Sequence, residues 1–268
     1  MTITDIEEIP NPHSIKMKPI REKQDINLDI INQNISRRNG MLNVYTGSGG
    51  SGKSSLMLNQ FKDKNMYKRV FNNIYYFCPA ASFNSVDKHP FEKLPNIYHT
   101  LDVATLEDIY DELAGKKEEA TKKKEKKEPV MIIGEEEKEP EKEDEEKEIQ
   151  YSALIIDDFA DALKDPDIQR FLSKMIIKAR HLCCSFFITL QSYTYCPKIL
   201  RKQITYITIF KPKSYAEFES IAIEMFNLNK ADALTLYNYV FDKAYSHLDY
   251  NTVDNSIYKN FNLLKIKN

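Results

Sequence analysis

Short apolar runs alternate with amphipathic segments along most of the chain. Apolar runs of strand length occupy residues 41–45, 73–78, 151–156, 185–190 and 204–210. Apolar residues at helical spacing occupy residues 101–113 and 168–180, and residues 214–243 have the pattern of two helices. Strands that alternate with helices form a parallel sheet covered on both faces, so the pattern predicts an α/β fold.

Residues 116–148 interrupt this pattern with a dense run of charge. Residues 116–128 contain seven lysines and four glutamates, and residues 135–148 contain ten acidic residues and three lysines. Such a run cannot bury enough apolar surface to join a core, so we predict a solvated, disordered insert. The net charge of −2 conceals it. Without the insert the chain has 28 basic and 26 acidic residues, which indicates no strongly basic surface for nucleic acid.

The sequence has no run of the roughly 20 apolar residues that a membrane span needs. Its acidic first ten residues also lack the profile of a signal peptide. We therefore expect a soluble, intracellular protein. At 268 residues, the chain has the length of one domain with extensions.

The glycines are concentrated in one place, because four of the seven lie between residues 47 and 52. This stretch fits the P-loop pattern G-x-x-x-x-G-K-[ST]; it reads Gly47-Ser48-Gly49-Gly50-Ser51-Gly52-Lys53-Ser54. An apolar strand precedes it and a helical pattern follows, which is the context that the motif requires. Successive N–H groups at a helix N-terminus bind anions, so we predict a phosphate site here.

The motif gives a role to each of its parts. We expect the N–H groups of residues 49–53 to hold the α- and β-phosphates of ATP, and Lys53 to reach the β- and γ-phosphates. The Ser54 hydroxyl is expected to be a ligand of Mg²⁺. Ser55 either contacts the α-phosphate or caps the helix.

Two carboxylates, Asp157 and Asp158, follow the apolar strand at residues 151–156. In P-loop ATPases a carboxylate at such a strand end lies beside the P-loop and holds Mg²⁺, and we assign this role to Asp157. Asp158 is then expected to act on the attacking water, as a general base or by orienting it. Asp161 is a weaker candidate, more typical of a helix cap or a surface acid.

A third polar residue, Gln191, ends the strand at residues 185–190, at the same carboxyl edge of the predicted sheet. We expect its amide to sense the γ-phosphate and the water. We expect a strand inserted between the P-loop strand and the Asp157 strand, residues 74–78, which is the arrangement of additional-strand ATPases, whose sensor strand lies next to the P-loop strand. The predicted fold is a three-layer P-loop NTPase sandwich of this type, with a mainly parallel central sheet.

Hydrolysis also needs positive charge near the γ-phosphoryl group as negative charge develops there. Arg180, at the end of a predicted helix, and Arg201, after Pro197, are the candidates. In a ring, one of them could reach into a neighbour's site. The sequence leaves the choice between them open.

Several further stretches have a recognisable pattern. They are Arg-Asn-Gly at 38–40, Leu-Ile-Ile-Asp-Asp at 154–158, Ala-Arg-His at 179–181, Leu-Arg-Lys-Gln-Ile-Thr at 200–205, Ile-Phe-Lys-Pro at 209–212 and Tyr-Lys-Asn-Phe at 258–261. Together with the P-loop and Gln191, they make residues 38–265 resemble the DNA-packaging ATPases of large double-stranded DNA viruses, the poxvirus-type branch of the FtsK/HerA superfamily. The chain departs from the wider superfamily at Asp158, where glutamate is usual, and in its charged insert.

The resemblance implies an oligomeric motor that uses ATP and Mg²⁺ to drive double-stranded DNA into a capsid. It implies a homo-oligomeric ring, capsid proteins as partners, and a location at the assembly site in the host cytoplasm, with the virion as a second location. The chain then divides into an N-terminal arm, residues 1–37, and a P-loop ATPase domain, residues 38–268, which carries the insert.

Three alternatives stay open beside this interpretation. A helicase-like ATPase of the same superfamily would act on DNA outside packaging. A small-molecule kinase shares the P-loop, but kinases of that type usually have an arginine-rich lid, and the sequence has no such cluster. A nucleotide-binding scaffold would not need Lys53, Asp157 and Gln191 together.

Overall fold

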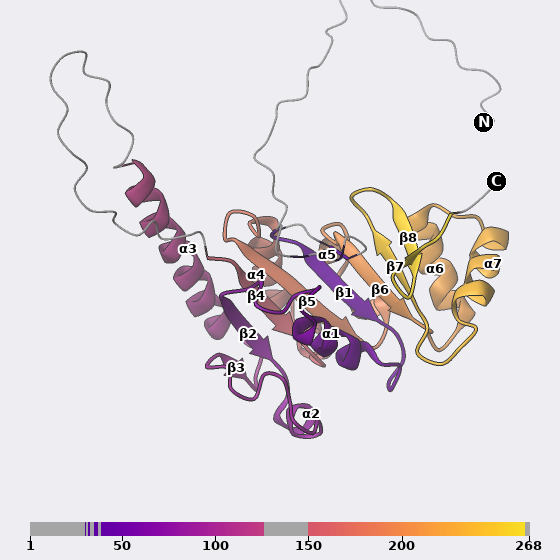
Figure 1. Ribbon diagram of the computed structural model, residues 1–268, viewed down its shortest axis with the longest axis horizontal. Coiled ribbons are helices and arrows are strands. Elements are labelled where there is room, and N and C mark those ends of the chain that lie inside the picture. The colour runs from indigo at the N-terminus through magenta and orange to yellow at the C-terminus, as the bar shows by residue number, and fades with distance from the viewer. Residues whose placement is uncertain (1–29, 31, 33–34, 37–38, 126–149, 266–268) are drawn as a thin grey trace, which may run out of the picture.

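The structure, a computed structural model, describes residues 30, 32, 35, 36, 39–125 and 150–265 (Figure 1). In chain order its elements are β1 (Leu42–Thr46), α1 (Lys53–Lys62), β2 (Asn73–Phe77), α2 (Ala80–Asn84), β3 (Ile97–Tyr98), α3 (Val103–Glu125), β4 (Ser152–Ile156), α4 (Pro166–Ile177), β5 (Cys184–Leu190), α5 (Lys198–Arg201), β6 (Tyr206–Phe210), α6 (Tyr215–Phe226), α7 (Lys230–Val240), β7 (His247–Asn251), β8 (Ser256–Lys259) and β9 (Asn262–Leu263). Two short 3-10 turns, Ala162–Lys164 and Tyr193–Tyr195, follow β4 and β5. No helix among these described residues is both long and apolar enough to cross a membrane.

The strands form one sheet in the order β3-β2-β4-β5-β1-β6-β7-β8-β9. Pairing is parallel from β3 to β6 and antiparallel from β6 to β9. The predicted mainly parallel sheet is therefore confirmed. The strand order also confirms the additional-strand arrangement, with the sensor strand β5 next to the P-loop strand β1. The inserted strand is β5 and not the predicted strand at residues 74–78, because that strand is β2 and pairs with β4 on the side away from β1.

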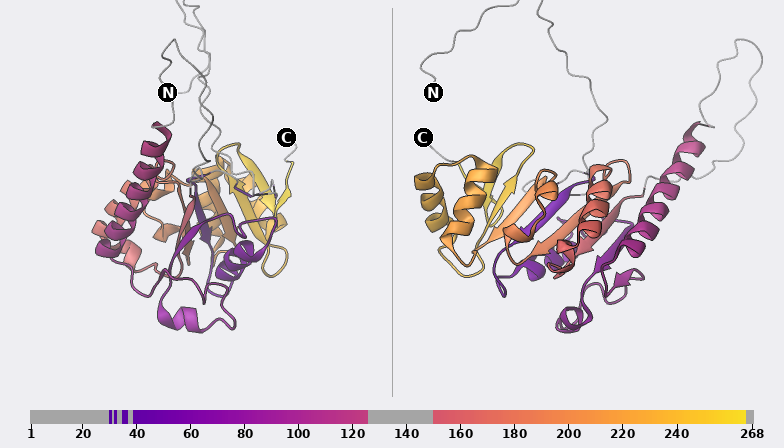
Figure 2. Two further views of the ribbon diagram at one scale, coloured as in Figure 1. Left: turned by 60° about the vertical axis from the view of Figure 1, so that its left-hand side comes forward. Right: turned by 180° about the vertical axis from the view of Figure 1, so that it is seen from behind.

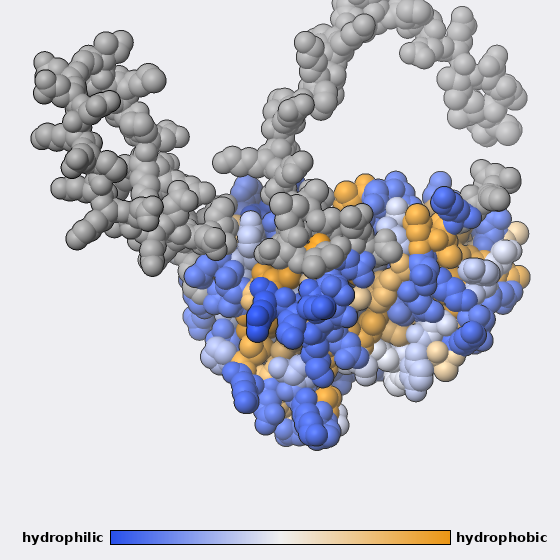
Figure 3. Space-filling model, in the orientation of Figure 1, coloured by the Kyte–Doolittle hydropathy of each residue, from blue (hydrophilic) through white to orange (hydrophobic). Residues whose placement is uncertain are grey.

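Helices cover both faces of the sheet, which gives the predicted three layers (Figure 2). Alternate side chains of a strand point to opposite faces. In β1, Leu42 and Val44 join a core cluster with α3, α4, α6 and α7, whereas Tyr45 joins a second cluster with α1. The sheet is thus buried on both sides, as the continuous apolar runs predict. The outer surface of α1 and α2 is hydrophilic (Figure 3).

The N-terminal part of the chain contributes to this core before the predicted start of the domain at residue 38. Ile30 and Ile35 are buried in the cluster beneath α1. Residues 1–29, most of the predicted arm, lie outside the described residues.

The helix α3 is longer than the predicted helix at residues 101–113, and it continues to Glu125 in the predicted insert. Residues 116–125 are lysine, glutamate, alanine and threonine, without glycine or proline. Lysine, glutamate and alanine favour a helix once a packed helix precedes them. The predicted insert from residue 126 to 148 lies outside the described residues.

The antiparallel strands β7, β8 and β9 were not predicted. They extend the sheet beyond β6 as a meander at the C-terminal end of the domain (Figure 1). The loop that enters β7 consequently comes back to the carboxyl end of β6, beside the P-loop.

Candidate nucleotide-binding site

The P-loop is a tight turn between β1 and α1, and its conformation requires glycine at both ends. Gly47 has φ +149°, and an added Cβ would lie 2.7 Å from the Cβ of Phe210. Gly52 is the N-cap of α1, with φ +102°, in the left-handed region. The first turn of α1 contains no acidic residue. Its N–H groups lack intrahelical acceptors, so this end of the helix is built to bind an anion.

Lys53 lies inside this loop and is only 8% exposed. Its Nζ donates to the carbonyl oxygens of Gly47, at 2.8 Å, and Ser48, at 2.9 Å. Burial lowers the pKa of Lys53, and the nearby charges of Asp157 and Asp158 oppose that shift. The ammonium is therefore held where a phosphate on the loop would meet it.

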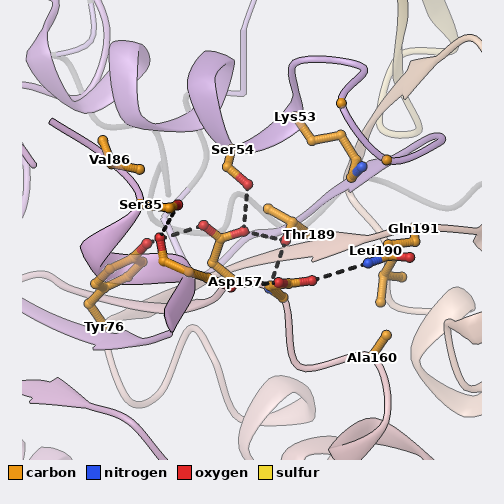
Figure 4. A pocket seen from close by; sticks show the side chains of 14 residues that line it. Lys53, Ser54, Tyr76, Ser85, Val86, Asp157, Ala160, Thr189, Leu190 and Gln191 are labelled. Atoms are coloured by element: carbon orange, nitrogen blue, oxygen red, sulfur yellow. Dashed lines mark hydrogen bonds between the residues drawn. The ribbon is translucent and has the colours of Figure 1, made fainter. Parts of the chain in front are cut away.

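Asp157, directly after β4, is 4% exposed and accepts hydrogen bonds from three hydroxyl groups (Figure 4). Its Oδ1 accepts from Ser54 Oγ at 2.8 Å and from Thr189 Oγ1 at 2.5 Å. Its Oδ2 accepts from the Tyr76 hydroxyl at 3.1 Å. Burial and the neighbouring Asp157 raise the pKa of Tyr76 far above its ordinary value, so the phenol remains a donor. Elements α1, β5 and β2 thus fix one carboxylate.

Asp158 is the next residue, but its surroundings differ. It is exposed and has φ +61°, a left-handed conformation that turns its side chain away from the strand. Ser82 Oγ donates to its Oδ2 at 2.7 Å, and Gln191 Nε2 donates to its Oδ1 at 3.3 Å. Its backbone N–H donates to Thr189 Oγ1 at 3.1 Å, so this single threonine contacts both acids.

These groups line one pocket of about 260 Å³ at the carboxyl edge of the sheet. It brings together seven residues of the predicted site: Gly49, Gly50, Lys53, Ser54, Asp157, Asp158 and Gln191. The pocket has the Lys53 ammonium and the N–H groups of the P-loop on one wall and the carboxylates on the other. This arrangement can hold a polyphosphate and, between the phosphate and the acids, a water molecule.

The two predicted arginines do not line this pocket. The backbone of Arg180 lies against Gly40, within 2.6 Å of the position of an added Cβ there. Gly40 lies just before β1, and the P-loop lies just after β1. Because a strand rises about 3.3 Å per residue, the backbone of Arg180 lies roughly 20 Å from the P-loop, at the opposite edge of the sheet. Arg201 is held by Glu224, at 3.1 Å, and by the carbonyl oxygen of Cys196, at 2.9 Å. Neither side chain is among those that line the pocket of its own chain.

The structure also places the two weaker candidates, Asp161 and Ser55. Asp161 is almost fully exposed and pairs with Lys164 at 2.6 Å, so it is a surface acid outside the pocket. Ser55 is exposed in the first turn of α1, and the N-cap is Gly52, so Ser55 does not cap the helix. Its contact with an α-phosphate stays a prediction.

Sequence reasoning missed Thr189, Tyr76 and Ser82. Thr189 carried a usable signal, since it is a hydroxyl residue inside an otherwise apolar strand. Tyr76 lies in a run of aromatic residues and gave no such signal. Ser82 belongs to α2, a short helix that the apolar pattern did not predict.

A phosphate-binding loop between strand and helix, facing two acids that follow a strand one place removed in the sheet, defines a P-loop ATPase of the additional-strand type. The chain belongs to the poxvirus A32 protein family, which matches residues 32–263. No match is found among curated proteins.

Solved structures of low sequence identity have the same fold. The DNA-packaging ATPase B204 of Sulfolobus Turreted Icosahedral Virus is 16% identical, with a TM-score of 0.50, over 85% of this chain and 99% of that one. ATPases 2 and 3 of EssC from Geobacillus thermodenitrificans are 18% identical, with a TM-score of 0.54, over 84% of this chain and 39% of that one. The type VII secretion ATPase EccC of Thermomonospora curvata is 14% identical, with a TM-score of 0.51, over 91% of this chain and 30% of that one.

Proposed function

We propose that this protein is an ATP-hydrolysing DNA translocase that packages viral genomic DNA into the capsid. The observation that carries the ATPase part is the meeting of Lys53, Asp157 and Asp158 in one pocket. Membership of the poxvirus A32 family supports the viral setting. The name of B204 as a DNA-packaging ATPase supports the choice of DNA as the translocated polymer.

In this proposal the phosphates of ATP lie on the P-loop. The N–H groups of residues 49–53 hold the α- and β-phosphates, and Lys53 neutralises charge on the β- and γ-phosphates. Its present acceptors, two loop carbonyls, keep the ammonium pointing into the loop. Ser55 is proposed to contact the α-phosphate.

Ser54 and Asp157 are proposed to hold Mg²⁺. Their oxygens already lie 2.8 Å apart, and a hydroxyl and a carboxylate are the hard donors that this cation prefers. The remaining hydroxyl donors, from Thr189 and Tyr76, keep the carboxylate in place beside the loop. When bound, the cation would offset negative charge on the phosphates.

Asp158 is proposed to accept the proton of the attacking water, with Gln191 orienting that water. Both acids line the pocket, but Asp158 is exposed, whereas Asp157 is buried among donors. Gln191 already contacts Asp158, so the amide and the carboxylate can engage the same water.

Assembly into a homo-oligomeric ring on capsid proteins completes the proposal. Neither Arg180 nor Arg201 lines the pocket of its own chain, and in the ring one of them is proposed to reach a neighbour's γ-phosphate. The assembly site in the host cytoplasm and the virion are the proposed locations.

Stimulation of ATP hydrolysis by duplex DNA tests the function. We expect purified full-length protein to hydrolyse Mg-ATP faster with duplex DNA than without it, and the Asp158→Asn variant to stay slow in both conditions. An ATP hydrolysis rate that is the same with and without duplex DNA would contradict the translocase proposal. Duplex unwinding without capsid association would favour the helicase-like ATPase. Phosphorylation of a metabolite would favour the kinase, and ATP binding without turnover would favour the scaffold.

A further inference from the structure

A second cavity, of about 340 Å³, lies on the other side of the P-loop. It is lined by the P-loop itself, by the segment that follows β6, and by the loop between α7 and β7. Gly49 and Gly50 line both cavities, so the two are separated only by the crest of the loop. In Figure 1 the loop that enters β7 lies beside the P-loop, at the carboxyl end of β6.

The two cavities have opposite chemistry. The first contains the carboxylates of Asp157 and Asp158, from the β4 side of the sheet. The second is lined by two lysines, Lys211 and Lys243. No acidic residue of the described part of the chain lines it. A nucleoside triphosphate is an unbranched chain, so a terminal phosphate that faces the acids directs the nucleoside away from them, and the second cavity lies on that side of the P-loop.

Tyr245 gives this cavity an aromatic wall. It is 71% exposed, and its φ of +63° is in the left-handed region. Its Cδ1 lies 3.3 Å from the position of an added Cβ on Gly52, so the ring lies beside the start of α1. An exposed aromatic ring held in a strained loop at the edge of a phosphate site is an arrangement that fits stacking on a base.

Polar groups for reading the edge of a base are few. Among the described residues that line this cavity there is no Asn, Gln, Asp or Glu, the amide and carboxylate side chains that usually read purine edges. The Ser51 hydroxyl is buried there without a hydrogen-bond partner, so it is available to the ribose or to a phosphate. Ser48 is already occupied, because its Oγ donates to the carbonyl oxygen of Lys211 at 3.2 Å.

We propose that this cavity holds the nucleoside of the bound triphosphate, that Tyr245 stacks on its base, and that the base is recognised by its face rather than its edge. The site then accepts purine nucleoside triphosphates with little discrimination between adenine and guanine. This inference rests on the proposed function, since it needs a triphosphate on the P-loop.

The test is equilibrium binding of Mg-ATP, Mg-GTP and inorganic tripolyphosphate to the full-length protein and to Tyr245→Ala, with Tyr245→Phe as the conservative variant. Loss of stacking is expected to weaken binding of both nucleotides to Tyr245→Ala by about tenfold, since base–aromatic stacking contributes roughly 1–3 kcal/mol per base. Tripolyphosphate, which has no base, is expected to bind the wild type and Tyr245→Ala equally. Tyr245→Phe should retain nucleotide affinity, because the ring remains.

Tyr239→Ala is the matched control, since Tyr239 is an exposed tyrosine, 60% accessible, outside both cavities. Unchanged ATP affinity in Tyr245→Ala would overturn the inference, and so would an equal loss of tripolyphosphate affinity. A preference of the wild type of more than about a hundredfold for either purine would overturn recognition by the face. A wild type that binds tripolyphosphate but not ATP would refute the nucleoside site alone, whereas binding of neither would refute the proposed function.

Discussion

The two sides of the P-loop are built in different ways. On the β5 side, the residues at strand ends form a dense network in which Asp157 accepts three hydroxyl hydrogen bonds and is 4% exposed. On the β6 side, the wall consists mainly of loops, and one of its two aromatic residues, Tyr245, is 71% exposed. One side is held by hydrogen-bonded strands and the other by two loop segments, one of which accepts an exposed hydrogen bond from Ser48 of the P-loop.

This difference follows from what each side is proposed to do. Cleavage of a phosphate depends on the position of the acid and the water to a fraction of an ångström, so those groups belong on rigid elements. Binding of a nucleoside by stacking tolerates small shifts of the ring. We therefore expect substitutions on the β5 side to change turnover, and substitutions on the β6 side to change affinity.

Lys53→Ala removes the group common to both activities and is expected to have the largest effect. The variant should lose nucleotide binding, turnover, or both, by at least about a hundredfold, because the β- and γ-phosphates lose their buried cation. Calorimetric binding of Mg-ATP and steady-state hydrolysis are the measurements. Lys62→Ala, in the exposed last turn of the same helix, is the control and should behave as wild type. Normal hydrolysis by Lys53→Ala would refute the site on both sides.

Asp158→Asn is expected to separate binding from turnover. The variant should bind ATP normally and hydrolyse it at least about a hundredfold more slowly, since asparagine cannot take the proton of the water. Binding and kcat are measured on the same preparation. Asp161→Asn is the matched control, because Asp161 is exposed and pairs only with Lys164 outside the pocket. Normal turnover in Asp158→Asn, with a slow Asp161→Asn, would move the base to Asp161.

The candidate site could be predicted from the sequence where it depends on strand ends. Asp157 and Gln191 end two parallel strands, and the carboxyl ends of parallel strands meet at one edge of the sheet. The hydroxyls that hold the acids depend on which strands are neighbours. Tyr76 reaches Asp157 only because β2 pairs with β4, and Thr189 reaches it only because β5 does. The apolar pattern within each strand does not predict which strands pair.

The fold was predictable where strands are continuously apolar, and less so at the C-terminus. The strand β7 contains Asp249, which has the character of a surface residue in the sequence but is fully buried. Thr208 Oγ1 donates to it at 2.8 Å, and burial raises the pKa of Asp249 to about 6. A buried acid in the middle of a strand breaks the apolar run, so the apolar pattern does not predict β7. The loop before β7 is the one that lines the second cavity.

Thr189→Val is expected to have an intermediate effect that tests the rigidity of the β5 side. Valine keeps the shape but removes the hydroxyl that donates to Asp157 and accepts from the N–H of Asp158. We expect kcat to fall by about tenfold or more through misplacement of the acids, and the free energy of unfolding to fall by about 1–3 kcal/mol. Steady-state kinetics and denaturant unfolding measure the two.

Thr208→Val is the control for that prediction, because Thr208 also donates to a buried carboxylate, that of Asp249. It should lose similar stability with unchanged kcat. Equal kinetic losses in the two variants would mean that Thr189 acts only through stability, and that the β5 side has no special positional demand.

Ser48→Ala is expected to have the smallest effect, and it tests the β6 side. The variant loses the exposed hydrogen bond from Ser48 Oγ to the carbonyl oxygen of Lys211, which ties the P-loop to the segment after β6. Exposed hydrogen bonds contribute at the low end of about 0.5–1.5 kcal/mol, so KM for ATP should rise about two- to threefold while kcat stays unchanged. Ser220→Ala removes an exposed serine contact within α6, to the carbonyl oxygen of Ala216, and should change neither parameter. A tenfold fall in kcat for Ser48→Ala would show that the loop side also sets the geometry of cleavage, because the P-loop would then be positioned from β6 and not only from β5.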